Sequence, residues 1–507
     1  MWNRSAAGDS YARRPRLVVL SVAILAAAAT LGAQQRLTPK QAAAKYSRAT
    51  RSFADAKYED AYKEYNEVFS TGEGDLSPGA LKGMIRSALR LSSFGIARKE
   101  AEALRAATND EDSLTLFGDA LWGAGLFDES EAAYRDAGQR FPNSARARFG
   151  IARSLAARGR LAEGLTESVT ALTTAPSDPE ILVLVAELYE RLFRYDDAAR
   201  VYETYVKVLP SRLRDDTDVA ALKIRLLRSF TGRRPVRIDG EGGTTTVPFT
   251  MRDRKVVITG QLNGRPMEFV LDTGADRTAV TGTSADRAGV RGIIETMITG
   301  VGAPGIRRLS VGRADTITVG DLTMHDIPVS IRRQNIPGTE SWQNETFSPM
   351  ALGLSVVIDY QRREVSFGRE IPVEPADFRL PLRVYRLPLV RGLVNDKYPA
   401  SFSVDTGGEM LSISKDMATQ LAMRPTRHIP LRVWGIMGLD PDAFVLPGVD
   451  LHFDAIQYEK FAVAVLNLRA PSVLLGFQLG GVLGYAFLNE YHVAMDFTRG
   501  ELRLRKL

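Results

Sequence analysis

The sequence predicts a multidomain α + β protein, in which an array of helix pairs is followed by a β-rich region of two similar lobes. Three observations carry this prediction. Prolines recur at a constant interval, at Pro142, Pro176 and Pro210. After Phe230 the composition changes to short β-rich runs separated by turn signals. Within this second half, one series of landmarks occurs twice in the same order.

The bulk composition narrows the classes of function. The 507 residues exceed the usual size of one domain, so two or three domains are expected. A net charge of +6 without a long basic run predicts no nucleic-acid partner. The absence of cysteine excludes disulfides, thiol nucleophiles and cysteine zinc sites. No metal or cofactor is predicted, because no ligand spacing connects the four histidines, His325, His428, His452 and His492.

Residues 1–33 have the parts of an export signal. A basic stretch ending at Arg16 precedes an apolar run over residues 17–31, and small residues follow up to Ala33. The run is also close to the length that spans a membrane, so residues 17–33 are either part of a cleaved signal peptide or an uncleaved anchor. Both readings predict an exported protein, periplasmic or secreted.

Residues 40–230 are predicted to form a helical repeat domain. Helix pairs that recur at a fixed interval stack, because one pair cannot bury its apolar stripe alone. The interval of the prolines also separates small and aromatic residues: Phe127, Leu161 and Tyr195; Ser130, Gly164 and Ala198; Tyr134, Ser168 and Tyr202.

This pattern resembles the tetratricopeptide repeat, a unit of about 34 residues. About five copies are expected, with a closing helix over Asp216–Phe230. The resemblance implies a concave face that binds a protein or peptide partner. A spacer or an oligomerisation arm is the alternative.

The second half is predicted to hold a linker and two lobes. Residues 231–246 are rich in glycine and threonine and are expected to be the linker. Lobe 1 is expected at residues 247–372 and lobe 2 at residues 373–507. In each lobe an asparagine turn precedes an apolar strand, with Asn263 in the first and Asn395 in the second.

Both apolar strands end in an Asp-Thr-Gly tripeptide, and the same landmarks follow in each lobe. One such tripeptide is a weak signal because Asp and Gly favour turns, but two with matched flanks indicate a duplication. The tripeptides are Asp272-Thr273-Gly274 and Asp405-Thr406-Gly407. The later landmarks are Gly300-Val301-Gly302, Leu352-Gly353 and Asp359 in lobe 1, and Trp434-Gly435-Ile436, Leu483-Gly484 and Asp496 in lobe 2.

This arrangement resembles the retroviral and pepsin-like aspartic peptidases over about residues 245–507. The resemblance implies an all-β bilobal acid-protease fold with Asp272 and Asp405 as the catalytic pair. Two adjacent carboxylates cannot both ionise, so they share one proton, and one acts as base while the other acts as acid.

The resemblance also assigns supporting roles. Thr273 and Thr406 are expected to hydrogen-bond across the lobe interface, and Gly274 and Gly407 to permit turns that a side chain would block. The glycine-rich segments are flap candidates that close over an extended substrate. Trp434 is expected either to line a subsite or to be buried in the core.

The sequence therefore predicts an aspartic endopeptidase that needs no cofactor and cleaves a protein or peptide substrate. The alternative is a binding protein in which a degenerate protease fold and the repeats hold a partner without cutting it. Lobe 1 is expected to be shortened, since six residues lead from Gly353 to Asp359 and twelve from Gly484 to Asp496. The helix expected at Ala486 then has no counterpart in lobe 1.

Overall fold

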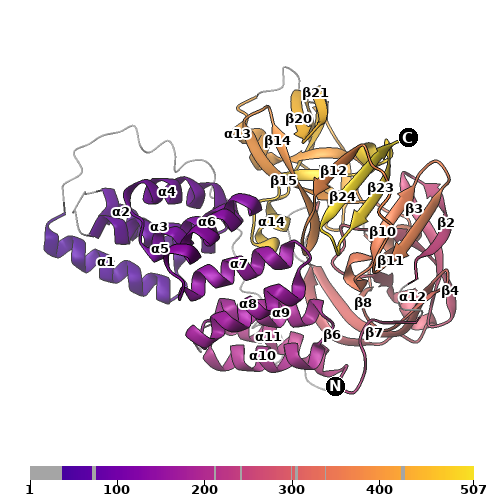
Figure 1. Ribbon diagram of the computed structural model, residues 1–507, viewed down its shortest axis with the longest axis horizontal. Helices are drawn as coiled ribbons and strands as arrows, with labels where there is room; N and C mark the ends of the chain where they lie inside the picture. The colour runs from indigo at the N-terminus through magenta and orange to yellow at the C-terminus, as the bar shows by residue number, and fades with distance from the viewer. Residues whose placement is uncertain are drawn as a thin grey trace, which may run out of the picture.

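The helical and β-rich halves predicted from the sequence are both present in the computed structural model (Figure 1). The predicted signal or anchor falls on residues 1–33, outside the described residues. In the part of the chain that is described, no helix is long and apolar enough to cross a membrane. The structure describes residues 37–70, 76–210, 213–239, 243–298, 300–302, 307–336, 338–423 and 429–507.

The repeat domain consists of consecutive helices joined by short turns, so the predicted helical array is confirmed. The helices are α1 (Pro39–Ala54), α2 (Tyr58–Ser70), α3 (Ser77–Arg90), α4 (Phe94–Ala107), α5 (Glu111–Gly123), α6 (Phe127–Arg140), α7 (Ala145–Ala157), α8 (Leu161–Thr174), α9 (Pro179–Arg191), α10 (Tyr195–Val208) and α11 (Arg214–Arg228).

The constant repeat interval arises from the requirements of helix capping and close helix packing. The side chains of Asp110, Ser144 and Asp178, spaced by this interval, accept backbone N–H groups at the starts of α5, α7 and α9. The small residue of each pair lies where the helices cross closely: a Cβ atom on Gly164 would lie 2.8 Å from Ala152 O. Leu227 of α11 packs into the last apolar cluster and closes the array.

Lobe 1 is built mainly of strands. Part of the predicted linker 231–246 is itself a strand, because β1 pairs with β8. The elements are β1 (Arg237–Asp239), β2 (Thr245–Arg252), β3 (Lys255–Leu262), β4 (Arg265–Leu271), β5 (Ala279–Thr281), α12 (Gly282–Arg287), β6 (Gly292–Ile298), β7 (Arg307–Val319), β8 (Leu322–Arg332), η4 (Ser341–Asn344), β9 (Thr346–Phe347), η5 (Met350–Leu352), β10 (Ser355–Asp359) and β11 (Glu364–Gly368).

Lobe 2 repeats this order of elements. They are β12 (Phe378–Pro381), β13 (Arg383–Tyr385), β14 (Leu387–Val394), β15 (Tyr398–Val404), β16 (Leu411–Ser414), α13 (Lys415–Gln420), β17 (Ile429–Pro430), β18 (Val433–Gly435), β19 (Gly438–Asp440), β20 (Phe444–Phe453), β21 (Ile456–Leu466), α14 (Arg469–Leu475), β22 (Gly481–Leu483), α15 (Tyr485–Leu488), β23 (Tyr491–Asp496) and β24 (Glu501–Lys506).

A shared sheet joins the lobes. Strand β10 of lobe 1 pairs with β23 of lobe 2, with Val356 opposite Met495. Strands β11 and β2 continue the sheet on one side, and β24 and β12 on the other. The lobes therefore share backbone hydrogen bonds as well as side-chain packing.

The asparagine turns are related by the internal duplication. Asn263 and Asn395 both have a φ of +48°. The Oδ1 atom of Asn263 accepts the N–H of Thr316 at 2.9 Å, and the Oδ1 atom of Asn395 accepts that of Asp450 at 2.9 Å. Each turn thus aligns the strand that leads to an Asp-Thr-Gly tripeptide.

The expectation that lobe 1 is shortened was wrong. The strand that pairs in parallel with β4 is β9, whereas its counterpart in lobe 2 is β22. Ser348 therefore occupies the position of Gly484, and Leu352-Gly353 is not the matching landmark. Eleven residues lead from Ser348 to Asp359, close to the twelve in lobe 2. The short helix η5 is then the counterpart of α15. A serine in the glycine position concealed the match.

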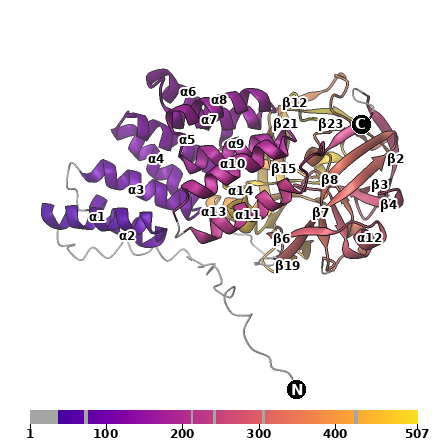
Figure 2. The same cartoon turned by 90° about the horizontal axis from the view of Figure 1, so that it is seen from below.

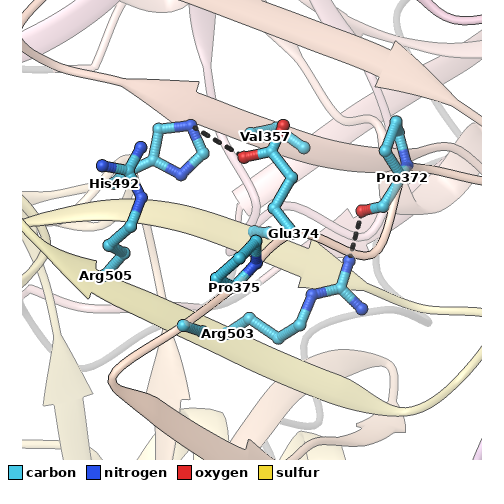
Figure 3. A pocket seen from close by; sticks show the side chains of 9 residues that line it. Val357, Pro372, Glu374, Pro375, His492, Arg503 and Arg505 are labelled. Carbon is cyan, nitrogen blue, oxygen red and sulfur yellow. Dashed lines mark hydrogen bonds and ion pairs between the residues drawn. The ribbon is translucent and has the colours of Figure 1, made fainter.

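The segment between β11 and β12, which connects the two lobes, packs over a small cavity in the shared sheet (Figure 3). Its volume is about 10 Å³, barely enough for one water molecule. Arg503 donates to Pro372 O at 3.0 Å and lies 3.1 Å from Asp496 Oδ2. These contacts fix the connecting segment between β11 and β12 onto the sheet and leave no space for a ligand.

The repeat array lies along one side of the β-rich half (Figure 2). Three successive turns between paired helices contact it. Gly125 O accepts the hydroxyl of Ser401 at 2.6 Å. A Cβ atom on Gly159 would lie 2.5 Å from Phe497 O, and one on Gly353 would lie 3.3 Å from the ring of Phe193. The turns thus touch lobe 2, the shared sheet and lobe 1 in order.

We expect Gly159→Ala to destabilise the protein by about 1–3 kcal/mol more than Gly289→Ala, because the new methyl group would overlap the Phe497 carbonyl. Both glycines have similar positive φ values, +80° and +72°, but apart from Gly289 and its chain neighbours no described residue has an atom within 4 Å of the Cβ position of Gly289. The comparison therefore removes the backbone cost common to both variants. Urea unfolding midpoints provide the measurement, and equal midpoints would contradict the contact.

Candidate active site

The two Asp-Thr-Gly loops meet between the lobes. Asp272 follows β4, and its N–H donates to Phe347 O at 3.0 Å. Asp405 follows β15, and its N–H donates to Leu483 O at 3.0 Å. Each aspartate is thus placed by the strand that precedes it and by the parallel strand beside it.

The two carboxyl groups lie in one site. A Cβ atom on Gly407 would lie 2.8 Å from Asp272 Oδ1 and 3.1 Å from Asp405 Oδ1. One position the size of a carbon atom therefore contacts both carboxyl groups. A Cβ atom on Gly274 would lie 2.6 Å from Asp405 Oδ2. Glycine is required at both positions because a side chain would displace a carboxyl group.

The threonines join the two loops with a reciprocal set of hydrogen bonds. The N–H of Thr273 donates to Thr406 Oγ1 at 3.1 Å, and the N–H of Thr406 donates to Thr273 Oγ1 at 3.1 Å. The Thr273 hydroxyl donates to Val404 O at 2.8 Å, and the Thr406 hydroxyl donates to Leu271 O at 2.7 Å. Both side chains are fully or almost fully buried, so each bond also satisfies a group that water cannot reach.

The environment raises the pKa of both aspartates. Burial is the main cause for Asp272, and the negative charge of Asp405 adds to it. Burial also raises the pKa of Asp405, against the opposing effect of Lys255 and of the N–H of Gly407, which donates to Asp405 Oδ1 at 2.8 Å. Two close carboxyl groups with raised pKa values favour one shared proton over two charges.

Lys255, which was not predicted from the sequence, connects the lobes beside the aspartates. It begins β3 in lobe 1, and its Nζ atom donates to Gly407 O and lies 3.4 Å from Glu409 Oε1 of lobe 2. Its side chain is only 14% exposed, so its charge is weakly screened. This charge lowers the pKa of both aspartates and partly offsets burial. No local motif marks the lysine, because its partners are distant in the sequence.

Arg332 makes the site asymmetric. Arg332 is the last residue of β8 and pairs with Thr281 of β5. The corresponding residue of lobe 2 is Leu466, which pairs with Ser414 of β16. The Arg332 guanidinium donates to Asn344 O at 2.8 Å, and its charge lowers the pKa of Asp272. The two sides of the site therefore differ in polarity.

The flap candidates from the two lobes touch each other. The segment Gly300–Gly302 follows β6, while Trp434, Gly435 and Ile436 lie in the β18–β19 hairpin. The N–H of Met437 donates to Val301 O at 3.0 Å. A Cβ atom on Gly302 would lie 2.9 Å from Gly438 N, so close approach of the two backbones requires glycine here.

Trp434 is not a core residue. It is 46% exposed, and a Cβ atom on Gly338 would lie 2.5 Å from its ring. Leu439 pairs with it across the hairpin and is also exposed. The second flap candidate therefore presents an apolar surface to the solvent.

Comparison with known protein families agrees with this architecture. Residues 258–356 match the family described as Aspartyl protease. The match includes Asp272, Thr273 and Gly274 and ends within β10. No curated protein matches the chain. The matched segment covers most of lobe 1, which is thus similar to the aspartyl protease family, and the helical array precedes it.

Solved structures similar to this chain resemble its helical part. A thermophilic TPR protein of Thermus thermophilus is 20% identical with a TM-score of 0.33, over 36% of this chain and 98% of that one. PilF of Pseudomonas aeruginosa is 15% identical with a TM-score of 0.29, over 38% and 92%. YrrB, a TPR protein with an unusual peptide-binding site, is 17% identical with a TM-score of 0.24, over 35% and 90%.

We expect Thr406→Val to lower the free energy of unfolding by about 1–3 kcal/mol for each buried group left without a partner. The substitution removes the acceptor of the Thr273 N–H and the donor to Leu271 O. Thr406→Ser keeps the hydroxyl and is the matched control. Urea unfolding monitored by fluorescence distinguishes them, and equal losses in both variants would show that the hydroxyl contributes little.

The raised pKa values also predict how stability depends on pH. A carboxyl group with a folded-state pKa above its unfolded value contributes stability at acidic pH, and this contribution is lost as pH rises through the folded-state pKa. The parent should therefore lose more stability between acidic and neutral pH than Asp405→Asn, which has one carboxyl group fewer in the pair. Urea midpoints measured across pH test this. The control is Asp286→Asn, on the exposed face of α12. Parallel curves for parent and Asp405→Asn would contradict the assignment.

Proposed function

We propose that the protein is an aspartic endopeptidase in which Asp272 and Asp405 activate a water molecule, and that the repeat domain binds protein or peptide. The observation that carries this proposal is the pair of carboxyl groups, whose oxygens lie 2.8 Å and 3.1 Å from a single point, the Cβ position of Gly407. Equivalent threonines and glycines of both lobes support the pair. The match to the aspartyl protease family supports the same class of reaction.

The chemistry needs one ionised and one protonated aspartate. The ionised group accepts a proton from water while the water oxygen attacks the scissile carbonyl carbon. The protonated group donates to the carbonyl oxygen as negative charge develops there. The amine nitrogen then gains a proton, the carbon–nitrogen bond breaks, and a carboxyl group and an amine are released. No metal or cofactor takes part in this proposal.

The flap candidates suit the site to an extended substrate, and Lys255 sets the protonation of the aspartate pair. The touching segments at Val301 and Met437 would separate to admit a peptide and close over it to exclude water. Lys255 favours ionisation of one aspartate of the pair, whereas burial and charge repulsion oppose ionisation of the second. The proposed activity therefore has a limit on each side of its pH optimum.

We further propose that the protein acts outside the cytoplasm, in the periplasm or as a secreted protein. This proposal rests on the basic and apolar pattern of residues 1–33. Residues 17–33 would either be removed with the signal or stay as a tether to the membrane.

Digestion of a mixed peptide library, followed by mass spectrometry across acidic to neutral pH, tests the reaction. Asp272→Asn and Asp405→Asn should each reduce cleavage by roughly 10²–10⁴-fold, because neither aspartate can perform both proton transfers. Asp286→Asn, which changes an exposed carboxyl group of α12 that pairs with Arg333, should cleave like the parent. Normal cleavage by either active-site variant would exclude the aspartate pair as the catalyst. A parent that cuts nothing but binds peptides would favour the non-catalytic binding alternative.

A further inference from the structure

Three arginines lie where helices α7 and α9 of the repeat array meet lobe 2. Arg153 comes from α7, Arg191 ends α9, and Arg386 lies between β13 and β14. The Trp122 ring on which Arg153 stacks lies 5.1 Å from the ring of Tyr385, the last residue of β13, and Arg386 directly follows Tyr385. The charges of all three arginines, Arg191 included, oppose the increase in the pKa of Tyr385 that burial and Glu187 cause. The repeats and the protease domain therefore contribute to one cluster of positive charge.

Arg153 is held by aromatic stacking. Its guanidinium lies 4.0 Å from the ring centre of Trp122 and 4.8 Å from that of Phe149. It donates to the hydroxyl of Tyr134 at 2.9 Å, but its buried Nε atom has no hydrogen-bond partner among the described residues. Asp119 lies 3.6 Å away but also pairs with another arginine of α7, so Arg153 is only partly neutralised.

In the part of the chain that the structure describes, Arg191 differs from arginines of α3 and α7 in having no ion-pair partner. Arg146 pairs with Asp119 at 2.7 Å, and Arg90 pairs with Glu180 at 2.5 Å. Within the described residues Arg191 forms no ion pair or side-chain hydrogen bond, although Glu187 lies one helical turn before it. Burial lowers the pKa of Arg191 to about 10. Arg191 is half-buried, and its unpaired guanidinium offers a bound carboxylate a partner that is weakly screened by water.

Arg386 adds a cation from the protease domain. Its Nη1 atom donates to Leu474 O at 2.8 Å, and most of its donors remain available in the part of the chain that is described. It has a φ of +59°, an uncommon conformation for a residue other than glycine. The strand register places it immediately before Leu387, the position in lobe 2 that corresponds to Lys255 in lobe 1.

The cluster adjoins the proposed cleft. Val301 of the first flap candidate packs in the same apolar cluster as Trp122, Tyr385 and Leu387. On the side of lobe 1, the charge of Arg277, five residues after Asp272, acts on Glu190 of α9. Val301 of the flap candidate and Arg277 near the Asp272 loop thus interact with helices α5 and α9 of the repeats, respectively.

We propose that Arg153, Arg191 and Arg386 form an exosite that binds acidic side chains of an extended peptide substrate, outside the residues at the scissile bond. This inference rests on the proposed peptidase function and specifies its substrate class. Guanidinium groups pair with carboxylates through two parallel hydrogen bonds. Among the described residues of the cluster, Glu187 is a carboxylate without an ion pair, and it would repel an acidic ligand less than three arginines attract it.

Binding can be measured without cleavage in the full-length Asp405→Asn protein. The probes are a short fluorescein-labelled peptide of alternating glutamate and alanine and a matched peptide with glutamine in place of glutamate. Fluorescence anisotropy should show the glutamate peptide binding about tenfold more tightly. Added Arg191→Gln or Arg386→Gln should remove this preference. Arg200→Gln, an exposed arginine of α10, is the matched control and should retain it.

Equal binding of the two peptides, or an unchanged preference in both the Arg191→Gln and the Arg386→Gln proteins, would overturn the exosite. Should Arg191→Gln fail to fold, Arg386→Gln decides alone, and Arg191→Lys should keep part of the preference because it keeps the charge. Cleavage by the parent separates the two proposals. A glutamate preference in binding without any cleavage supports the exosite and refutes the peptidase. Cleavage of both peptides with equal KM supports the peptidase and refutes the exosite.

Discussion

The structure depends on holding two carboxyl groups together in a place where both burial and mutual repulsion oppose their charges. No local interaction between Asp272 and Asp405 could achieve this, since the carboxylates repel each other whenever both ionise. The crossed hydrogen bonds of Thr273 and Thr406 fix the two loops, and the shared β10–β23 pairing fixes the lobes behind them. The position of the pair is therefore determined by backbone contacts of both lobes, and its protonation by burial and by Lys255.

The repeat domain takes part in this arrangement. Its turns at Gly125, Gly159 and Phe193 contact lobe 2, the shared sheet and lobe 1 respectively. Its closing helix α11 packs with Phe230 against Ile294 of β6, the strand that leads to the first flap candidate. The repeats are therefore held against elements that position the cleft, unlike a spacer on a flexible linker.

Features with a local pattern could be predicted from the sequence. The constant interval between the prolines predicted the helical array because capping and packing repeat at that interval, and the duplicated tripeptides identified the aspartates that the fold brings together. Lys255 and Arg332 could not be found in this way, because their importance comes from partners far along the chain. The landmark in lobe 1 was misplaced at Gly353 because Ser348, which occupies the structural position, lacks the expected glycine.

The contacts of the repeat turns also tie the length of the repeat to the spacing of the surfaces that these turns touch. Gly125, Gly159 and Phe193 are spaced by whole repeats, and the surfaces they touch are spaced to match. Repeats before α5 can vary in number without moving any docking turn. A repeat added or lost between α5 and α10 would put every later turn opposite the wrong surface and would move α11 away from β6. The number of repeats in this central part is therefore constrained by the β-rich half, while the outer part of the array can change in length.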